Sequence, residues 1–60
     1  MIGRFVIWVE DTHNNVTRAF VWRGVASEGI ARARNEALVR GIAFVDIWAT
    51  PLANVEREFA

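Results

Sequence analysis

The sequence contains no cysteine, and histidine occurs only once, as His13. Without cysteine the chain can form no disulfide, and one histidine cannot supply the ligands of a standard structural zinc site. A domain of 60 residues buries only about 60% of the surface of its unfolded chain, so domains of this size often need staples or an oligomeric state. We therefore expect self-association to contribute to the stability of this chain, and we expect no metal and no cofactor.

Lysine is also absent, and the seven arginines balance seven carboxylates to a formal net charge of zero. A neutral domain has no general attraction to nucleic acid or to an anionic membrane. No stretch approaches 18 apolar residues, and Glu10 and Asp11 close the first apolar run, so we expect neither a membrane span nor a secretory signal. The composition, 53% hydrophobic without low-complexity segments, predicts one ordered cytoplasmic domain over 1–60.

Three runs rich in β-branched and aromatic residues predict strands over about 2–10, 16–25 and 42–49. Asn14 and Asn15 lie between the first two runs, and asparagine tolerates the left-handed backbone conformation that tight turns need. The first two strands are therefore expected to form a hairpin.

A run of Ala, Arg, Glu and Leu between the second and third strands predicts a helix over 28–40. Ser27 is the expected N-cap and Gly41 the expected glycine after the last turn. The helix returns the chain, so the third strand can pair antiparallel with the first. The predicted fold is an α+β domain of ββαβ type, with a three-stranded antiparallel sheet in the order 2-1-3 and the helix on one face.

Side chains two apart share a face of a strand, so the pattern also predicts two faces of the sheet. The helix carries the small residues Ala33 and Ala37, and we expect the aliphatic face of the sheet to pack against them. The opposite face would then collect five aromatic side chains: Trp8, Phe20, Trp22, Phe44 and Trp48. Such a patch exceeds the few hundred Å² of apolar surface that monomers normally expose, so we expect something to cover it.

Three covers are compatible with the sequence. The first is the end of the chain itself, because Thr50 and Pro51 predict the start of a short helix over 51–59. That helix would carry an apolar stripe of Leu52, Val55 and Phe59. The second cover is another copy of the chain, which would make a homodimer. The third is a different protein, because tryptophan and arginine dominate the binding energy of many interfaces.

These observations favour a small non-enzymatic protein-binding module, an adaptor or an inhibitor, that self-associates and uses its aromatic sheet face. A phage or plasmid accessory protein that binds a host protein would fit a chain of this length. The expected partner-binding residues are Arg4, Trp8, Arg18, Phe20, Trp22, Phe44 and Trp48.

The alternative function is binding of single-stranded nucleic acid, because aromatic residues beside arginines on a sheet can stack bases. Trp8, Trp22 and Phe44 would stack, and Arg4 and Arg18 would contact phosphates. The zero net charge and an aspartate expected on the same face, Asp46, weigh against this alternative.

Catalysis has little support in the sequence. His13 lies near Glu10 and Asp11, but the three residues share one short turn and lack a nucleophile positioned beside them. The glycines are too dispersed for a phosphate-binding loop. We therefore expect a protein without enzymatic activity.

Overall fold

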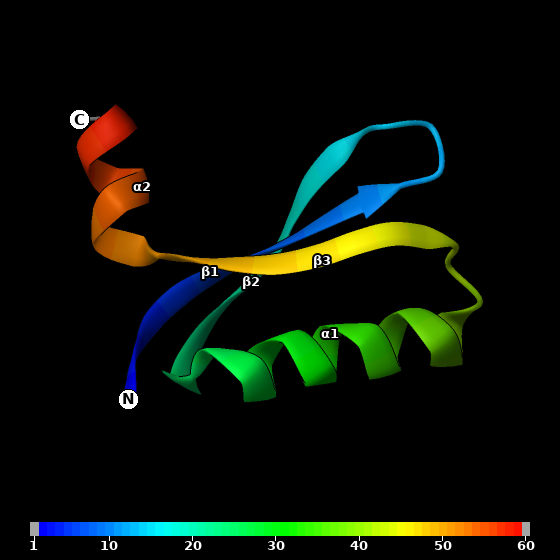
Figure 1. Ribbon diagram of the computed structural model, residues 1–60, viewed down its shortest axis with the longest axis horizontal. Coiled ribbons are helices and arrows are strands. Elements are labelled where there is room, and N and C mark those ends of the chain that lie inside the picture. The colour runs from blue at the N-terminus through cyan, green and yellow to red at the C-terminus, as the bar shows by residue number, and fades with distance from the viewer. Residues whose placement is uncertain (1, 60) are drawn as a thin grey trace.

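The computed structural model describes the backbone of residues 2–59 and the side chains of residues 2–55. Along the chain it contains β1 (Ile2–Asp11), β2 (Val16–Val25), α1 (Ala26–Arg40), β3 (Phe44–Pro51) and α2 (Leu52–Phe59). The strands form one antiparallel sheet in the order β2-β1-β3, so the predicted fold class and strand order are confirmed. Figure 1 shows α1 along one face of the sheet and α2 on the opposite side, at the end where β3 finishes.

Asp11 organises the hairpin between β1 and β2. Its Oδ1 accepts the backbone N–H groups of His13 at 2.8 Å and Asn15 at 3.0 Å. The left-handed residue of the turn is Asn14, with φ of 65°, as expected for an asparagine in a hairpin turn. The hydrogen bonds from Asn15 and then His13 stabilise the charged carboxylate and lower the pKa of Asp11 below its usual value.

The end of α1 follows the sequence prediction, but its start does not. Gly41 has φ of 69°, its N–H donates to the Leu38 carbonyl at 3.3 Å, and the Ile42 N–H donates to the Ala37 carbonyl at 2.8 Å. These two bonds make a Schellman motif. At the other end the predicted N-cap, Ser27, is wrong. β2 runs directly into the helix at Ala26, and the capping position belongs to Val25, which makes no side-chain cap.

The boundary between β3 and α2 also differs from the prediction. β3 begins at Phe44 instead of residue 42, because Ile42 completes the turn after α1. Pro51 remains in β3, opposite Phe5, and α2 begins one residue later. Thr50 does not start the helix either, because its register position is opposite Val6 on β1.

The core lies between α1 and the sheet. Its centre is formed by Ile7, Ala33 and Ile47, each 6% exposed or less. Partly buried side chains surround this centre: Phe5, Val9, Phe20, Trp22, Ile30, Phe44 and Ala49.

Two irregularities in the strand pairing decide which side chains reach this core. On β2, Ala19 has no partner on β1, since Phe20 pairs with Ile7 and Arg18 pairs with Trp8. On β3, Val45 is skipped in the same way. An extra residue in one strand of a pair interrupts the alternation of faces. Residues an even number apart across either bulge therefore lie on opposite faces of the sheet.

Candidate protein-binding surface

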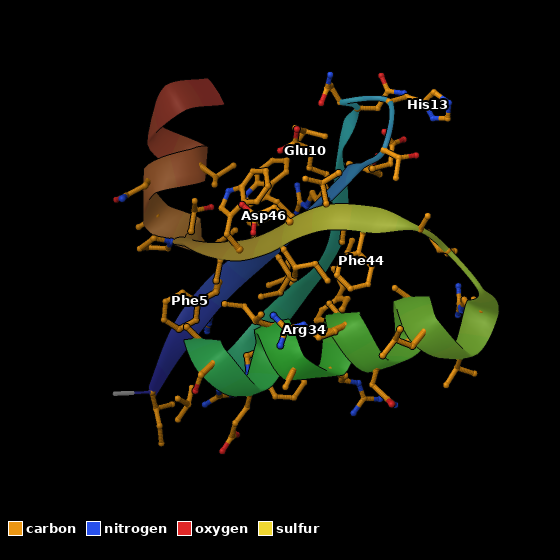
Figure 2. All side chains as sticks on the ribbon, turned by 45° about the vertical axis from the view of Figure 1, so that its right-hand side comes forward. Phe5, Glu10, His13, Arg34, Phe44 and Asp46 are labelled. Atoms are coloured by element: carbon orange, nitrogen blue, oxygen red, sulfur yellow. The ribbon has the colours of Figure 1, made fainter. Side chains whose placement is uncertain are left out.

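The predicted aromatic face is wrong for three of its five residues. Phe20, Trp22 and Phe44 pack into the core beneath α1. Phe20 and Trp22 lie opposite Ile7 and Phe5 on β1, and directly paired residues share a face. Figure 2 shows Phe44 and Phe5 on the side of the sheet that faces α1.

The large rings fit beneath α1 because the helix presents small residues to them. Gly29, Ala33 and Ala37 are its buried residues. A Cβ atom added at Gly29 would lie 2.7 Å from Cγ of Trp22, so the helix and the indole ring are in direct contact. The Trp22 Nε1–H donates to the Val25 carbonyl at 3.0 Å, which fixes the indole at the start of the helix. The small residues of α1 thus pack against aromatic side chains of the sheet, whereas the sequence pattern predicts aliphatic side chains on this face.

Trp22 also has contacts at its outer edge. The rings of Phe20 and Trp22 meet edge to face, with centroids 6.3 Å apart. The guanidinium of Arg32 lies 5.9 Å from the Trp22 ring centroid, and its Nε is 3.9 Å from Glu36 Oε1. Both charged side chains are largely exposed, so we regard this cluster as a cover for the core that contributes little to stability.

The sheet face opposite α1, called the open face below, carries a different set of side chains. Alternation along β1 and the pairing of β2 and β3 with it define the set. Its members are Ile2, Arg4, Val6, Trp8, Glu10, Val16, Arg18, Val21, Arg23, Val25, Asp46, Trp48 and Thr50.

A tryptophan pair occupies the middle of the open face. Trp8 and Trp48 are direct cross-strand partners, and both are half-buried. The Trp8 Nε1–H donates to Thr50 Oγ1 at 2.7 Å, so one indole is held by a neighbour two residues further along β3. On the β2 side the face continues with Arg18, opposite Trp8, and with Val21, which is 44% exposed. The pair is therefore fixed in place within a surface that is still accessible.

α2 covers only part of this face. It contacts β1 and β3, and Figure 1 places it at the end where β3 finishes. Val6 points away from α1 and yet has no exposed surface, which is consistent with a cover by α2 on this side. Leu52 and Val55 of the predicted stripe are half-buried, whereas the Phe59 side chain lies outside the described residues. Of the three covers compatible with the sequence, the C-terminal helix is therefore present at one end of the face.

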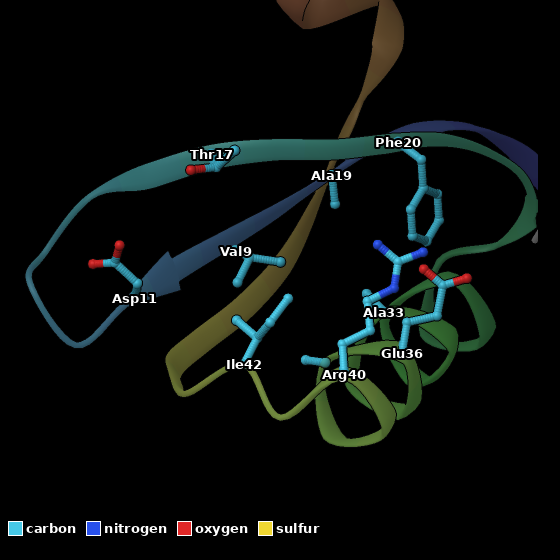
Figure 3. A pocket seen from close by; sticks show the side chains of 10 residues that line it. Val9, Asp11, Thr17, Ala19, Phe20, Ala33, Glu36, Arg40 and Ile42 are labelled. Carbon is cyan, nitrogen blue, oxygen red and sulfur yellow. The ribbon is translucent and has the colours of Figure 1, made fainter.

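A cleft of about 380 Å³ lies elsewhere, between the β1–β2 hairpin and the second half of α1. Its apolar walls include Val9, Ala19 and Phe20. Figure 3 shows Asp11 near the hairpin, away from Arg40 and Glu36 on the helix. Small-molecule sites usually gather a few polar groups around an apolar floor, and here Asp11 lies at the opposite end of the cleft from Glu36 and Arg40. We therefore assign no ligand to this cleft.

The structure brings together four of the seven predicted partner-binding residues, namely Arg4, Trp8, Arg18 and Trp48, on the open face. The base-stacking set of the nucleic-acid alternative is not gathered there, because Trp22 and Phe44 belong to the core.

The sequence prediction also missed members of the open face. Glu10, Val21 and Arg23 were not identified, although Glu10 has the same even spacing along β1 as Arg4 and Trp8. Figure 2 shows Glu10 and Asp46 on the side of the sheet away from α1. Alternation along β1, which the bulges leave regular, was the signal that could have found Glu10.

Within residues 2–59, no helix has the length and apolar character to cross a membrane. Among the side chains of residues 2–55, no group of three His, Cys, Asp or Glu residues is arranged to hold a metal ion. No family model, curated protein or solved structure matches this chain. The functional argument therefore depends on the geometry of the open face.

Proposed function

We propose that this chain is a small non-enzymatic module that binds a protein through the open face of its sheet. The observation that supports the proposal is the Trp8–Trp48 pair, which is fixed by the Thr50 hydroxyl and left accessible beside Arg18. Tryptophan and arginine anchors surrounded by smaller apolar contacts are typical of the energetic centre of protein interfaces.

The arrangement of the open face favours a role in binding a partner over a role in stabilising the fold. Tryptophans needed only for stability would be expected beneath a helix, where Trp22 lies. α2 contacts β1 and β3. Arg18 and Val21 on β2 remain exposed. For the biological role we propose an adaptor or inhibitor of a host protein in the cytoplasm, as phages and plasmids encode.

Site-specific photo-crosslinking in the cells that produce the chain tests this proposal. A photoreactive amino acid at Val21, on the open face, should give adducts of defined mass that mass spectrometry identifies as protein. The same amino acid at Ala31, on the exposed side of α1, is the control and should give none. Adducts with nucleic acid from position 21, or equal protein adducts from both positions, would overturn the proposal.

A further inference from the structure

The sheet has two outer strands, β2 and β3, and the direction of the backbone groups decides what each outer edge offers. In an antiparallel pair, successive residues turn their N–H and C=O groups alternately toward the neighbouring strand and away from it. The Asp11 N–H donates to the Asn15 carbonyl at 3.0 Å, so the odd-numbered residues of β1 turn toward β2. Phe5 therefore forms a hydrogen-bonded pair with Trp22.

The outer edge of β3 offers little to a further strand. The even-numbered residues of β1 turn toward β3, so the β3 residues opposite the odd-numbered ones turn outward: Ile47, Ala49 and Pro51. The Ile47 N–H donates to Asp46 Oδ1 at 2.8 Å, so it is already engaged, and proline has no N–H. Of these three outward residues, only Ala49 has an N–H left to donate. Charged side chains and proline on an edge strand are common protections against pairing.

The outer edge of β2 has no such protection along its middle. Val21 and Arg23 stand on either side of Trp22, so their N–H and C=O groups point away from β1. Both residues are exposed. β1 lies on the inner side of β2, and α1 packs across one face of the sheet. An open edge with unpaired donors and acceptors is a template for a strand of another chain.

We infer that a second copy of this chain adds its own β2 to this edge, antiparallel and about a two-fold axis at Trp22. An antiparallel pair of identical edges matches every outward donor with an outward acceptor, as a two-fold interface requires. A domain of 60 residues without a disulfide also gains stability from a second copy. The open face stays uncovered in this dimer, so the contact is additional to the one under the proposed function.

The register of the two strands follows from the backbone and the charges. Outward residues must face outward residues, so the axis passes through a residue of β2 and not between two residues. An axis at Arg23 would place this arginine directly opposite its copy, which is unfavourable. An axis at Val21 would bring the bulge at Ala19 into the ladder after one pair. With the axis at Trp22, Val21 of each copy pairs with Arg23 of the other, and each pair exchanges two hydrogen bonds.

The side chains beside the axis complement one another in this register. Trp22 lies opposite Trp22 of the second copy, and cross-strand aromatic pairs stabilise sheets. Phe20 lies opposite Gly24 of the second copy, over which an indole is placed, because a Cβ atom at Gly24 would lie 3.0 Å from Trp22 Nε1. Phe20 therefore meets an indole edge. Arg32 lies over the Trp22 ring with Glu36 beside it, so the part of α1 next to the axis carries both signs of charge.

The size of the contact predicts a weak dimer. The paired segment covers residues 19–25, roughly 23 Å at the usual rise of a strand. The sheet and α1 together give this side of the molecule a height of about 20 Å. Two copies would bury roughly 900 Å², below the range of standard interfaces, so we expect a dissociation constant in the micromolar range. Because the edge of β3 is protected, association should stop at the dimer.

Blocking one backbone donor tests the arrangement, and a chain of 60 residues can be made by chemical synthesis. A chain with an N-methyl group on Val21 lacks one outward N–H of β2. The control carries the N-methyl group on Ala49, whose N–H points outward on β3. In sedimentation equilibrium the Val21 chain should self-associate at least about tenfold more weakly than the natural chain, because each copy loses a hydrogen bond to the other. The Ala49 chain should dimerise like the natural chain, and circular dichroism should show that both fold.

The absence of cysteine allows a separate test of the register. Val21→Cys and Arg23→Cys would place their thiols on directly opposite residues, with Cα atoms about 5.5 Å apart, within reach of a disulfide. Two Val21→Cys chains would place theirs roughly 9 Å apart, beyond that reach. Under mild oxidation, followed by mass spectrometry, a mixture of the two variants should form the mixed disulfide at least about tenfold faster than either variant forms a disulfide with itself.

The outcomes separate this dimer from the proposed function. A natural chain that stays monomeric at millimolar concentration would overturn the dimer, whereas crosslinks from Val21 to another protein would still support the binding module; a crosslink to a second copy is recognised by its mass, twice that of the chain. Equal self-association of the chain methylated at Val21, or equal weakening by the methyl group at Ala49, would place the contact elsewhere. If the methylated chain fails to fold, equal rates of mixed and self disulfide formation would overturn the inference.

Discussion

At Gly29 α1 lies in close contact with the sheet, and replacing this glycine by alanine should push the two apart. The added Cβ would lie 2.7 Å from Cγ and 2.8 Å from Cδ1 of Trp22, and 3.0 Å from Cδ1 of Ile7. Carbon atoms in good contact are about 3.5 to 4.0 Å apart, so the indole or the helix must move by roughly 1 Å. The Trp22 ring has little freedom to do so, because Val25 accepts its Nε1–H and Phe20 packs against it.

Two opposing effects set the size of the change. Overpacking a core typically costs about 1–3 kcal/mol, whereas alanine in place of glycine inside a helix gains about 1 kcal/mol. We therefore expect Gly29→Ala to lower the free energy of unfolding by about 1 kcal/mol. With a urea dependence of about 1 kcal/mol per molar for a chain of this size, the midpoint should fall by roughly 1 M.

The control for Gly29→Ala is Ala31→Gly, on the exposed side of the same helix. It should lower the free energy of unfolding by about 1 kcal/mol, the difference in helix propensity, and so lower the midpoint as well. Gly29→Ala and Ala31→Gly would thus both destabilise the chain. Helix propensity alone would stabilise the first variant and destabilise the second. A midpoint that rises in Gly29→Ala would refute the contact between the helix and the indole ring.

Three further predictions concern other contacts, each measured by urea unfolding. Gly41→Ala should cost about 1 kcal/mol, because the left-handed conformation at φ of 69° is strained for alanine; an unchanged midpoint would contradict the Schellman geometry. Thr50→Val should cost about 1 kcal/mol, because it leaves the Trp8 indole N–H without its acceptor, whereas Thr17→Val, at an exposed position, should not. Asp11→Asn should be less stable than the natural chain at pH 7. The lowered pKa of Asp11 makes its contribution fully present above about pH 4, and that contribution is lost as the pH falls through the folded-state value. The difference should therefore disappear in acid, and a difference that grows there would contradict the role of the carboxylate.

The sequence was informative where a local signal determines the structure. Asn14 adopted the left-handed turn conformation, Gly41 ended α1, and the order of the elements fixed the strand order. These features depend on one residue or on connectivity. Ser27 misled the prediction because β2 continues into α1 without a loop, so no separate capping residue is used.

The faces of the sheet were harder to predict, for two physical reasons. Alternation fails at Ala19 and Val45, where a bulge skips a residue, and neither position has a sequence signal such as glycine. On β2 the choice of the face that meets the helix was also reversed, because Phe20 and Trp22, and not Val21, face α1. The small helix residues Gly29 and Ala33 leave room for aromatic rings between α1 and the sheet. Their small volume therefore indicated aromatic side chains, and not aliphatic ones, as the neighbours of α1 on β2. Trp8 and Trp48 were placed correctly on the same face because they are direct cross-strand partners in a part of the β1–β3 pairing that contains no bulge.

The most direct test of the open face as a surface left free for another protein is a measurement of molar mass and tryptophan emission on one sample. In a Trp22→Phe variant the remaining indoles are Trp8 and Trp48, so the emission reports on the open face alone. We predict that the mass rises with concentration from 6.8 kDa toward twice that value, and that the emission maximum does not move over the same range. A mass that stays constant, or an emission maximum that shifts to the blue as the mass rises, would contradict the account.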